Sequence, residues 1–131
     1  MDASLLRESF DLIATSKEEF VIAFYQRMFE KYPETQQFFT STDMSKQVKA
    51  LAGALAVVVT SVEQGDDITP TLRALGERHK GYGVQSQHYP IVSEILIETF
   101  QNVLGSQWTP AFEATWTQAF TLITQTMLSQ E

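Results

Sequence analysis

Residues 72–84, LRALGERHKGYGV, form the most informative segment of the sequence. Leu72, Leu75 and His79 lie at positions i, i+3 and i+7, which puts the three side chains on one face of an α-helix. We therefore expect His79 to point inward with the leucines. A histidine on an apolar face is either a hydrogen-bonded core residue or a metal ligand, and the spacing alone leaves both possibilities open.

Apolar residues at helical spacing continue on both sides of this stretch. They predict helices over residues 4–14, from 16 onward, 45–63, 87–104 and from 110 toward the end of the chain. Pro33 is expected to begin a short helical turn that carries Phe38 and Phe39. We expect the 45–63 helix to be mostly buried, and Val92 and Val103 to belong to the apolar stripe of the 87–104 helix. No window alternates convincingly as a β-strand would, so the prediction is an all-α fold of six to eight helices.

Local signals indicate where several helices begin and end. Ser16 and Glu19 match a capping box, in which each side chain bonds to the backbone N–H of the other residue. Thr69-Pro70 and Thr109-Pro110 each place a capping threonine before a proline at the first helical position. Gly105 is well placed to end the 87–104 helix.

Composition limits the classes of protein to which the chain can belong. The 131 residues, 44% of them hydrophobic, fit one domain over 1–131, and we find no repeat, linker or low-complexity tract. Nine Lys and Arg against sixteen Asp and Glu give a formal charge of -7, which repels nucleic acid and anionic lipid. The absence of cysteine excludes a disulfide, a thiolate metal site and a thioether-linked haem or bilin.

The N-terminus and the hydropathy pattern bear on location. The start, MDASLL, has no basic residue followed by a long apolar run, so it is not typical of a signal peptide. The apolar stretch 50–59 is far shorter than the roughly 20 residues needed to cross a bilayer. We expect a cytoplasmic protein with neither nucleic acid nor a membrane as partner.

The residues around His79 resemble those of a known family. The segment LGERHKGYGV, residues 75–84, followed by HYPIV, residues 88–92, closely resembles the proximal segment of single-domain bacterial haemoglobins and of the globin part of flavohaemoglobins. The resemblance covers essentially the whole chain. It implies a globin fold around a non-covalent haem b (iron protoporphyrin IX), with His79 as the axial iron ligand. It also implies that Leu75, Val84 and Tyr89 lie beside the cofactor.

The same resemblance implies a set of residues on the opposite, distal side of the haem. FYQRMF, residues 24–29, matches the family's tyrosine on the second helix, and KYPE, residues 31–34, leads to a phenylalanine that packs on the haem plane, here Phe39. QVKAL, residues 47–51, matches the distal helix, where Gln47 and Leu51 share a face because they are four apart. Tyr25 and Gln47 would donate hydrogen bonds to bound dioxygen. In the alternative interpretation, Tyr25 ends in solvent and Gln47 is a surface residue.

On the proximal side, the family uses a tyrosine and a glutamate to orient the ligating imidazole. The resemblance places these roles on Tyr89 and Glu131. Because Glu131 is the final residue of the sequence, where helix ends fray, we expect it to contribute less.

Two other segments compete for a functional role. His88 sits just inside a helix start and is expected to be partly exposed. The acidic run 63–67, EQGDD, lacks the alternating oxygen ligands and closing glutamate of a calcium loop, so a solvated turn is expected. We find no Gly-rich phosphate loop, nucleophile motif or zinc-like His/Glu pair.

Three classes of function remain open at this stage. The first is reversible dioxygen binding for transport or storage, with carbon monoxide and nitric oxide as further ligands. The second is a nitric-oxide dioxygenase; since the sequence shows no flavin or nicotinamide segment after residue 131, this activity would need an external electron donor or reductase. The third is a gas sensor or a haem-free interaction module with a globin fold. Phycobiliprotein-like proteins are excluded because they attach their bilin through cysteine.

Overall fold

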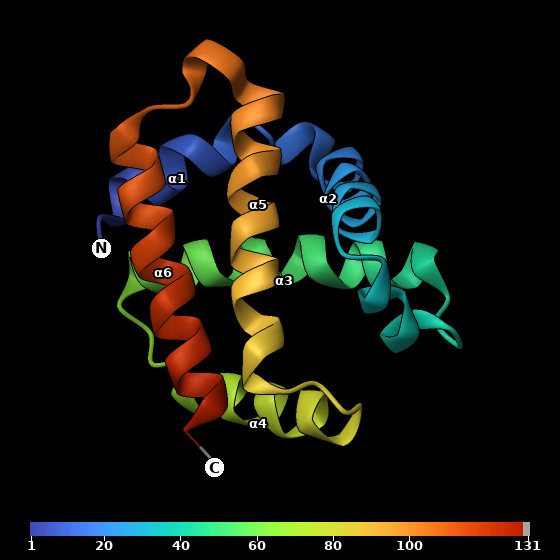
Figure 1. The fold of residues 1–131 in the computed structure, drawn as a ribbon. Coiled ribbons are helices and arrows are strands. Elements are labelled where there is room, and N and C mark those ends of the chain that lie inside the picture. Colours follow the sequence, from blue (N-terminus) through green and yellow to red (C-terminus); the bar gives the residue numbers. More distant parts are fainter. Residues whose placement is uncertain (130–131) are drawn as a thin grey trace.

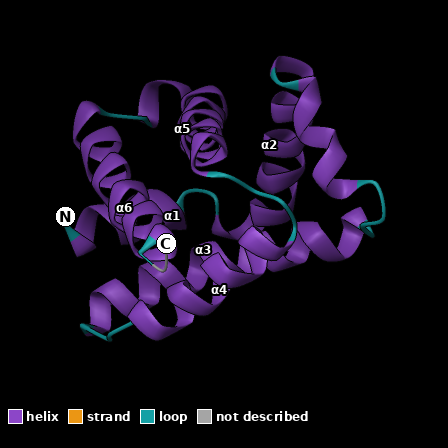
Figure 2. Ribbon diagram, turned by 60° about the horizontal axis from the view of Figure 1, so that its bottom comes forward, coloured by secondary structure: helices purple, strands orange, loops and turns teal. Residues whose placement is uncertain are grey.

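Helices make up nearly all of residues 1–129, the part of the chain that the computed structural model describes. The α-helices are α1 (Ala3–Asp11), α2 (Lys17–Lys31), α3 (Met44–Gln64), α4 (Thr69–Gly81), α5 (Tyr89–Leu104) and α6 (Pro110–Leu128). Short 3-10 helices lie between them: η1 (Ala14–Ser16), η2 (Pro33–Phe39), η3 (Ser86–His88) and η4 (Gly105–Gln107). The described residues contain no strand, so the predicted all-α class is confirmed, and short loops join the helices (Figure 2).

The helices cross one another around α5, which runs through the centre of the molecule with α6 beside it (Figure 1). Helix α2 packs on α5 and α3, and α1 packs on α3 and α6. Helix α4 packs mainly on α6 rather than on α3, the α-helix that precedes it in sequence. The helix that carries His79 is therefore supported by the C-terminal helix.

Aromatic side chains of α2, α5 and α6 form the centre of the core. The ring of Phe100 packs against Phe20 at 4.6 Å and against Trp116 at 5.0 Å between centroids. The indole Nε1 of fully buried Trp116 donates a hydrogen bond to Ser9 Oγ at 2.7 Å, which ties α6 to α1. The contact satisfies a polar group that would be costly to bury alone.

Two of the predicted helix boundaries are confirmed in detail. Thr109 caps α6, because its side chain accepts a hydrogen bond from Phe112 N at 3.1 Å. Gly105 ends α5 with a φ of 54°, a left-handed backbone angle that glycine adopts without a steric penalty.

Two other predicted caps are wrong. Ser16 is the last residue of η1, and its hydroxyl donates to the carbonyl oxygen of Ile13 at 3.5 Å, so it makes no capping box with Glu19. Thr69 lies within the first turn of α4, and the carboxylate of Asp67 accepts the Thr69 N–H at 2.9 Å. In both places a nearby oxygen competes with the predicted cap. The Ile13 carbonyl accepts the Ser16 hydroxyl, and the Asp67 carboxylate accepts the Thr69 N–H.

The expectation that α3 is mostly buried is also wrong. One stripe of α3 is buried (Val48, Ala52, Leu55 and Val59), whereas Val57 is 54% exposed. Val92 and Val103 on α5 are likewise exposed, because neighbouring helices cover only part of the helix circumference. By length and composition alone α3 could cross a membrane, a test that core helices also pass, and its buried face packs on α1 and α2.

Candidate functional site

Tyr25 and Gln47 form a pair between α2 and α3. Tyr25 is only 6% exposed, and its hydroxyl oxygen accepts a hydrogen bond from Gln47 Nε2 at 2.9 Å. The alternative in which Tyr25 ends in solvent is therefore wrong, and half-buried Gln47 points at the phenol rather than into bulk water.

Aromatic rings surround the phenol of Tyr25. Its centroid lies 4.9 Å from that of Phe24, 5.9 Å from that of Phe29 and 5.4 Å from that of Phe39. Leu51, one turn after Gln47, is partly buried against the same core. Phe39 thus packs on Tyr25 and Leu51 on the core, and their place beside a cofactor stays a prediction.

Burial raises the pKa of Tyr25. Loss of water raises the pKa of the phenol above its usual value, and the hydrogen bond from Gln47 offsets part of this increase. The phenol is therefore neutral near pH 7. The phenolic oxygen of Tyr25 accepts the hydrogen bond from Gln47, so the phenolic proton can still be donated to another group.

His79 presents one ring nitrogen without a partner. Nδ1 lies 2.8 Å from the carbonyl oxygen of Leu75, one turn earlier on α4. A carbonyl only accepts, so Nδ1 carries a proton, and in the neutral ring the lone pair is then on Nε2. Within residues 1–129, Nε2 makes no hydrogen bond, and the side chain is half-buried. A neutral imidazole with an oriented, free Nε2 is a good metal ligand.

Two tyrosine rings flank the imidazole. The centroid of the His79 ring lies 6.3 Å from that of Tyr89 and 6.1 Å from that of Tyr82, which is 65% exposed. Val84, partly buried, donates its N–H to the carbonyl oxygen of His79 at 3.1 Å. The structure thus brings Leu75, Val84 and Tyr89 to His79, as the resemblance implies. Glu131, the other residue expected to orient the ring, lies outside the described residues.

The Leu75 carbonyl is a partner that the sequence analysis missed. We expected side chains to orient the imidazole, but the contact at Nδ1 comes from the backbone of the preceding turn. The signal was present in the sequence, because a histidine within a helix always has a carbonyl four residues earlier.

The competing segments take structural roles. His88 Nδ1 accepts the N–H of Gln85 at 2.8 Å, and its ring lies 4.9 Å from that of Phe38, so the side chain caps a turn and is half-buried. In the acidic turn Glu63 binds Arg7, and Gly65 adopts a φ of 70°. No group of three or more His, Cys, Asp or Glu residues in the described part of the chain could hold a metal ion.

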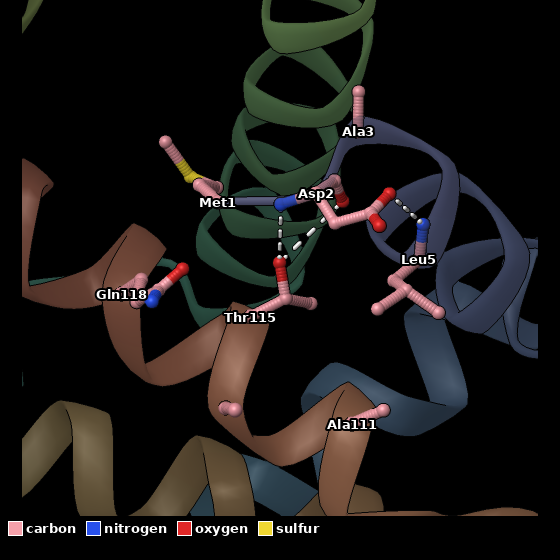
Figure 3. Close-up of a pocket in the computed structure, with 8 residues that line it drawn as sticks. Met1, Asp2, Ala3, Leu5, Ala111, Thr115 and Gln118 are labelled. Atoms are coloured by element: carbon pink, nitrogen blue, oxygen red, sulfur yellow. Dashed lines mark hydrogen bonds between the residues drawn. The ribbon is translucent and has the colours of Figure 1, made fainter.

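A shallow hollow of about 610 Å³ lies elsewhere, between the start of α1 and α6 (Figure 3). Thr115 bonds there to Asp2 N at 2.9 Å, and alanines form much of the remaining wall. None of the predicted site residues lines this hollow.

The donor set fits a haem rather than a bare metal ion. One imidazole nitrogen without a partner can supply a single axial bond, and a porphyrin supplies its own four nitrogens. Apolar side chains at Phe39, Leu51 and Leu75 suit a flat apolar ring, and no cysteine is present to attach it covalently.

Comparison with known families agrees with the all-α fold. The family model described as Globin matches residues 22–127. The chain belongs to the globin family.

Within this family, the chain is similar to flavohemoproteins. The chain is 32% identical over 110 residues to a flavohemoprotein of Bacillus subtilis (82% of this chain, 28% of the relative). It is 29% identical over 129 residues to one of Rhodopirellula baltica (97% and 32%). The chain thus spans about a third of the length of these relatives. The expected likeness to the globin part of flavohaemoglobins is confirmed.

Two solved structures share the fold over almost the whole chain. One is an engineered carbene transferase, assigned as a nitric oxide dioxygenase from Rhodothermus marinus, with a TM-score of 0.85 at 26% identity, covering 98% of this chain and 89% of that one. The other is a bacterial globin from Campylobacter jejuni, with a TM-score of 0.83 at 24% identity, covering 97% and 91%.

Proposed function

We propose that this chain is a haem protein that binds diatomic gases, with one non-covalent haem b held by Nε2 of His79. The observation that carries the proposal is the hydrogen bond of His79 Nδ1 to the Leu75 carbonyl, which fixes the tautomer and leaves Nε2 free. When bound, haem would supply an iron that takes a diatomic ligand, and His79 would hold that iron. Membership of the globin family and the flavohemoprotein relatives support this function.

The chain's own residues would act on the ligand from two sides. On the proximal side the Leu75 carbonyl would hold the imidazole, with Tyr89 beside the ring. On the distal side Tyr25 would donate its phenolic proton to a ligand with partial negative charge, and Gln47 would orient the phenol and serve as a second donor. Phe39 and Leu51 would keep water out of the pocket.

Our first candidate role is reversible dioxygen binding for transport or storage in the cytoplasm. The second is oxidation of nitric oxide with dioxygen to nitrate. It is favoured by the flavohemoprotein relatives and by the structural neighbour assigned as a nitric oxide dioxygenase. Formation of one nitrate from one nitric oxide and one dioxygen takes up one electron, which a reductase would supply. A gas-sensing role remains the alternative, whereas a haem-free interaction module would have no use for an oriented imidazole with a free nitrogen.

Visible absorption spectra test the proposal directly. We expect the purified protein to show a haem spectrum that shifts when the reduced form meets carbon monoxide, and acid–butanone to extract the haem. A protein that stays colourless despite ample haem during expression contradicts the proposal. Nitric-oxide consumption with an added reductase then separates the enzyme from the carrier.

A further inference from the structure

Helix α4 touches α6 at a point where no side chain fits between the two backbones. Gly76 is buried, and a β-carbon built on it would overlap the carbonyl oxygen of Met127 and lie 2.8 Å from its carbonyl carbon. Such overlap is with backbone, which cannot rotate away as the end of a side chain can. Any residue larger than glycine must push the two helices apart.

The contact is unusual among the glycines of this chain. At Gly53, Gly65, Gly81, Gly83 and Gly105, an added β-carbon would have nothing within 4 Å. Gly76 lies within a helix, where alanine is the better helix former, so its small size is needed for packing and not for backbone conformation.

The contact lies one turn from the proposed iron ligand. His79 follows Gly76 by three residues, or about 4.5 Å along the helix axis. A hydrogen bond from Arg73 Nε to Ser129 Oγ at 3.4 Å also joins α4, one turn before Gly76, to the residue that directly follows α6. In Figure 1 the last turns of α6 reach α4, and α6 is the main helix against which α4 packs.

We propose that Gly76 is a positioning residue for His79. Its contact with the Met127 backbone fixes the distance between α4 and α6, and thereby the position of the His79 imidazole. The inference rests on the proposed function, in which His79 holds the iron. The new element is that α6, the C-terminal helix, determines the position of His79.

The test compares Gly76→Ala with two controls. Gly53→Ala makes the same chemical change on α3 in open space, and it should favour the folded chain by up to roughly fivefold because alanine stabilises a helix. Ile13→Val removes one methylene from a fully buried side chain that belongs to no part of the site, so it lowers stability without touching α4.

We expect Gly76→Ala alone to shift the iron–histidine stretching frequency. It should also release haem at least about tenfold faster than the parent, the change that 1.4 kcal/mol of lost ligation would give. If Gly76→Ala lowered stability but left the iron–histidine stretching frequency unchanged, the Gly76 contact would serve stability only. This result would overturn the proposal. Stability and spectrum both equal to those of the parent would show that the β-carbon is accommodated, and this result would overturn the proposal as well.

Imidazole NMR separates this inference from the proposed function. If the parent binds no haem, the proposed function fails, but the ¹⁵N shifts of the His79 ring in the same full chain still report its position. They should change in Gly76→Ala and in neither control, and unchanged shifts overturn the inference. If Gly76→Ala does not fold, Ser129→Ala, which removes the hydrogen bond from Arg73, should shift the His79 signals in the same readout, and their constancy counts against positioning.

Discussion

The phenol of Tyr25 accepts a hydrogen bond from the amide of Gln47, 22 positions away, at 2.9 Å. The bond crosses from α2 to α3 and uses the phenol only as an acceptor. Its proton stays available for donation, and in the proposed function it would discriminate between diatomic gases by their charge distribution.

Tyr25→Phe should speed dioxygen release. A hydrogen bond to a charged acceptor is worth about 1.5–3 kcal/mol, and 1.4 kcal/mol is tenfold in an equilibrium constant. We expect dioxygen to leave roughly ten- to a hundredfold faster, since Gln47 partly compensates, whereas carbon monoxide release changes far less. Stopped-flow kinetics measure both rates. Tyr32→Phe, which deletes a hydroxyl that bonds to Glu94 outside the candidate site, is the matched control. An unchanged dioxygen rate in Tyr25→Phe would remove that residue from the site.

His79→Ala should abolish normal haem ligation, whereas His88→Ala should leave the ferrous spectrum nearly unchanged. The Nδ1 of His88 is already committed to the backbone N–H of Gln85, and the second variant loses this cap and the packing against Phe38. Spectra of the two reduced variants decide between them. Equal loss of haem, or loss only in His88→Ala, would show that the wrong histidine has been chosen.

Tyr89→Phe should alter the iron–histidine stretching frequency without unfolding the domain, because the deleted hydroxyl belongs to a ring that lies against the imidazole. Resonance Raman spectra report the frequency, and circular dichroism reports the fold. Deletion of Glu131 should have the smaller effect. A larger shift from that deletion would assign the main orienting role to the terminal carboxylate.

Tyr25 should make stability fall at alkaline pH. Burial raises the pKa of its phenol above the ordinary value of 10.0, so the folded chain holds the proton where the unfolded chain has lost it. The stabilising contribution is complete below pH 10 and is lost as pH rises toward the folded-state pKa. Urea unfolding of the haem-free chain between pH 9 and pH 11, roughly one unit either side of that ordinary value, should show that the free energy of unfolding falls as pH rises. Tyr25→Phe should reduce this pH dependence; an equal pH dependence in the parent and in Tyr25→Phe would contradict the effect of burial.

Much of the helical architecture could be predicted from the sequence because it follows from local periodicity. The i, i+3, i+7 pattern of Leu72, Leu75 and His79 predicts both the helix α4 and the inward face of the histidine. The Thr109 cap and the Gly105 terminus also depend on neighbouring residues only. The failures at Ser16 and Thr69 have the same origin, since each competing oxygen lies within three residues and the motif does not say which will win.

Local sequence patterns are therefore enough to predict the all-α class, most helix boundaries and, with the family resemblance, the identity of the candidate site residues. They do not predict which side chains meet, because that depends on how the helices pack. The hydrogen bond of Gln47 to Tyr25 and the fit of Gly76 against the Met127 backbone join distant segments. Periodicity shows which face of each helix is apolar, but not which helix covers that face or how closely it approaches. That distance depends on how the packed side chains of both helices fit together, and at Gly76 it is set by the absence of a side chain.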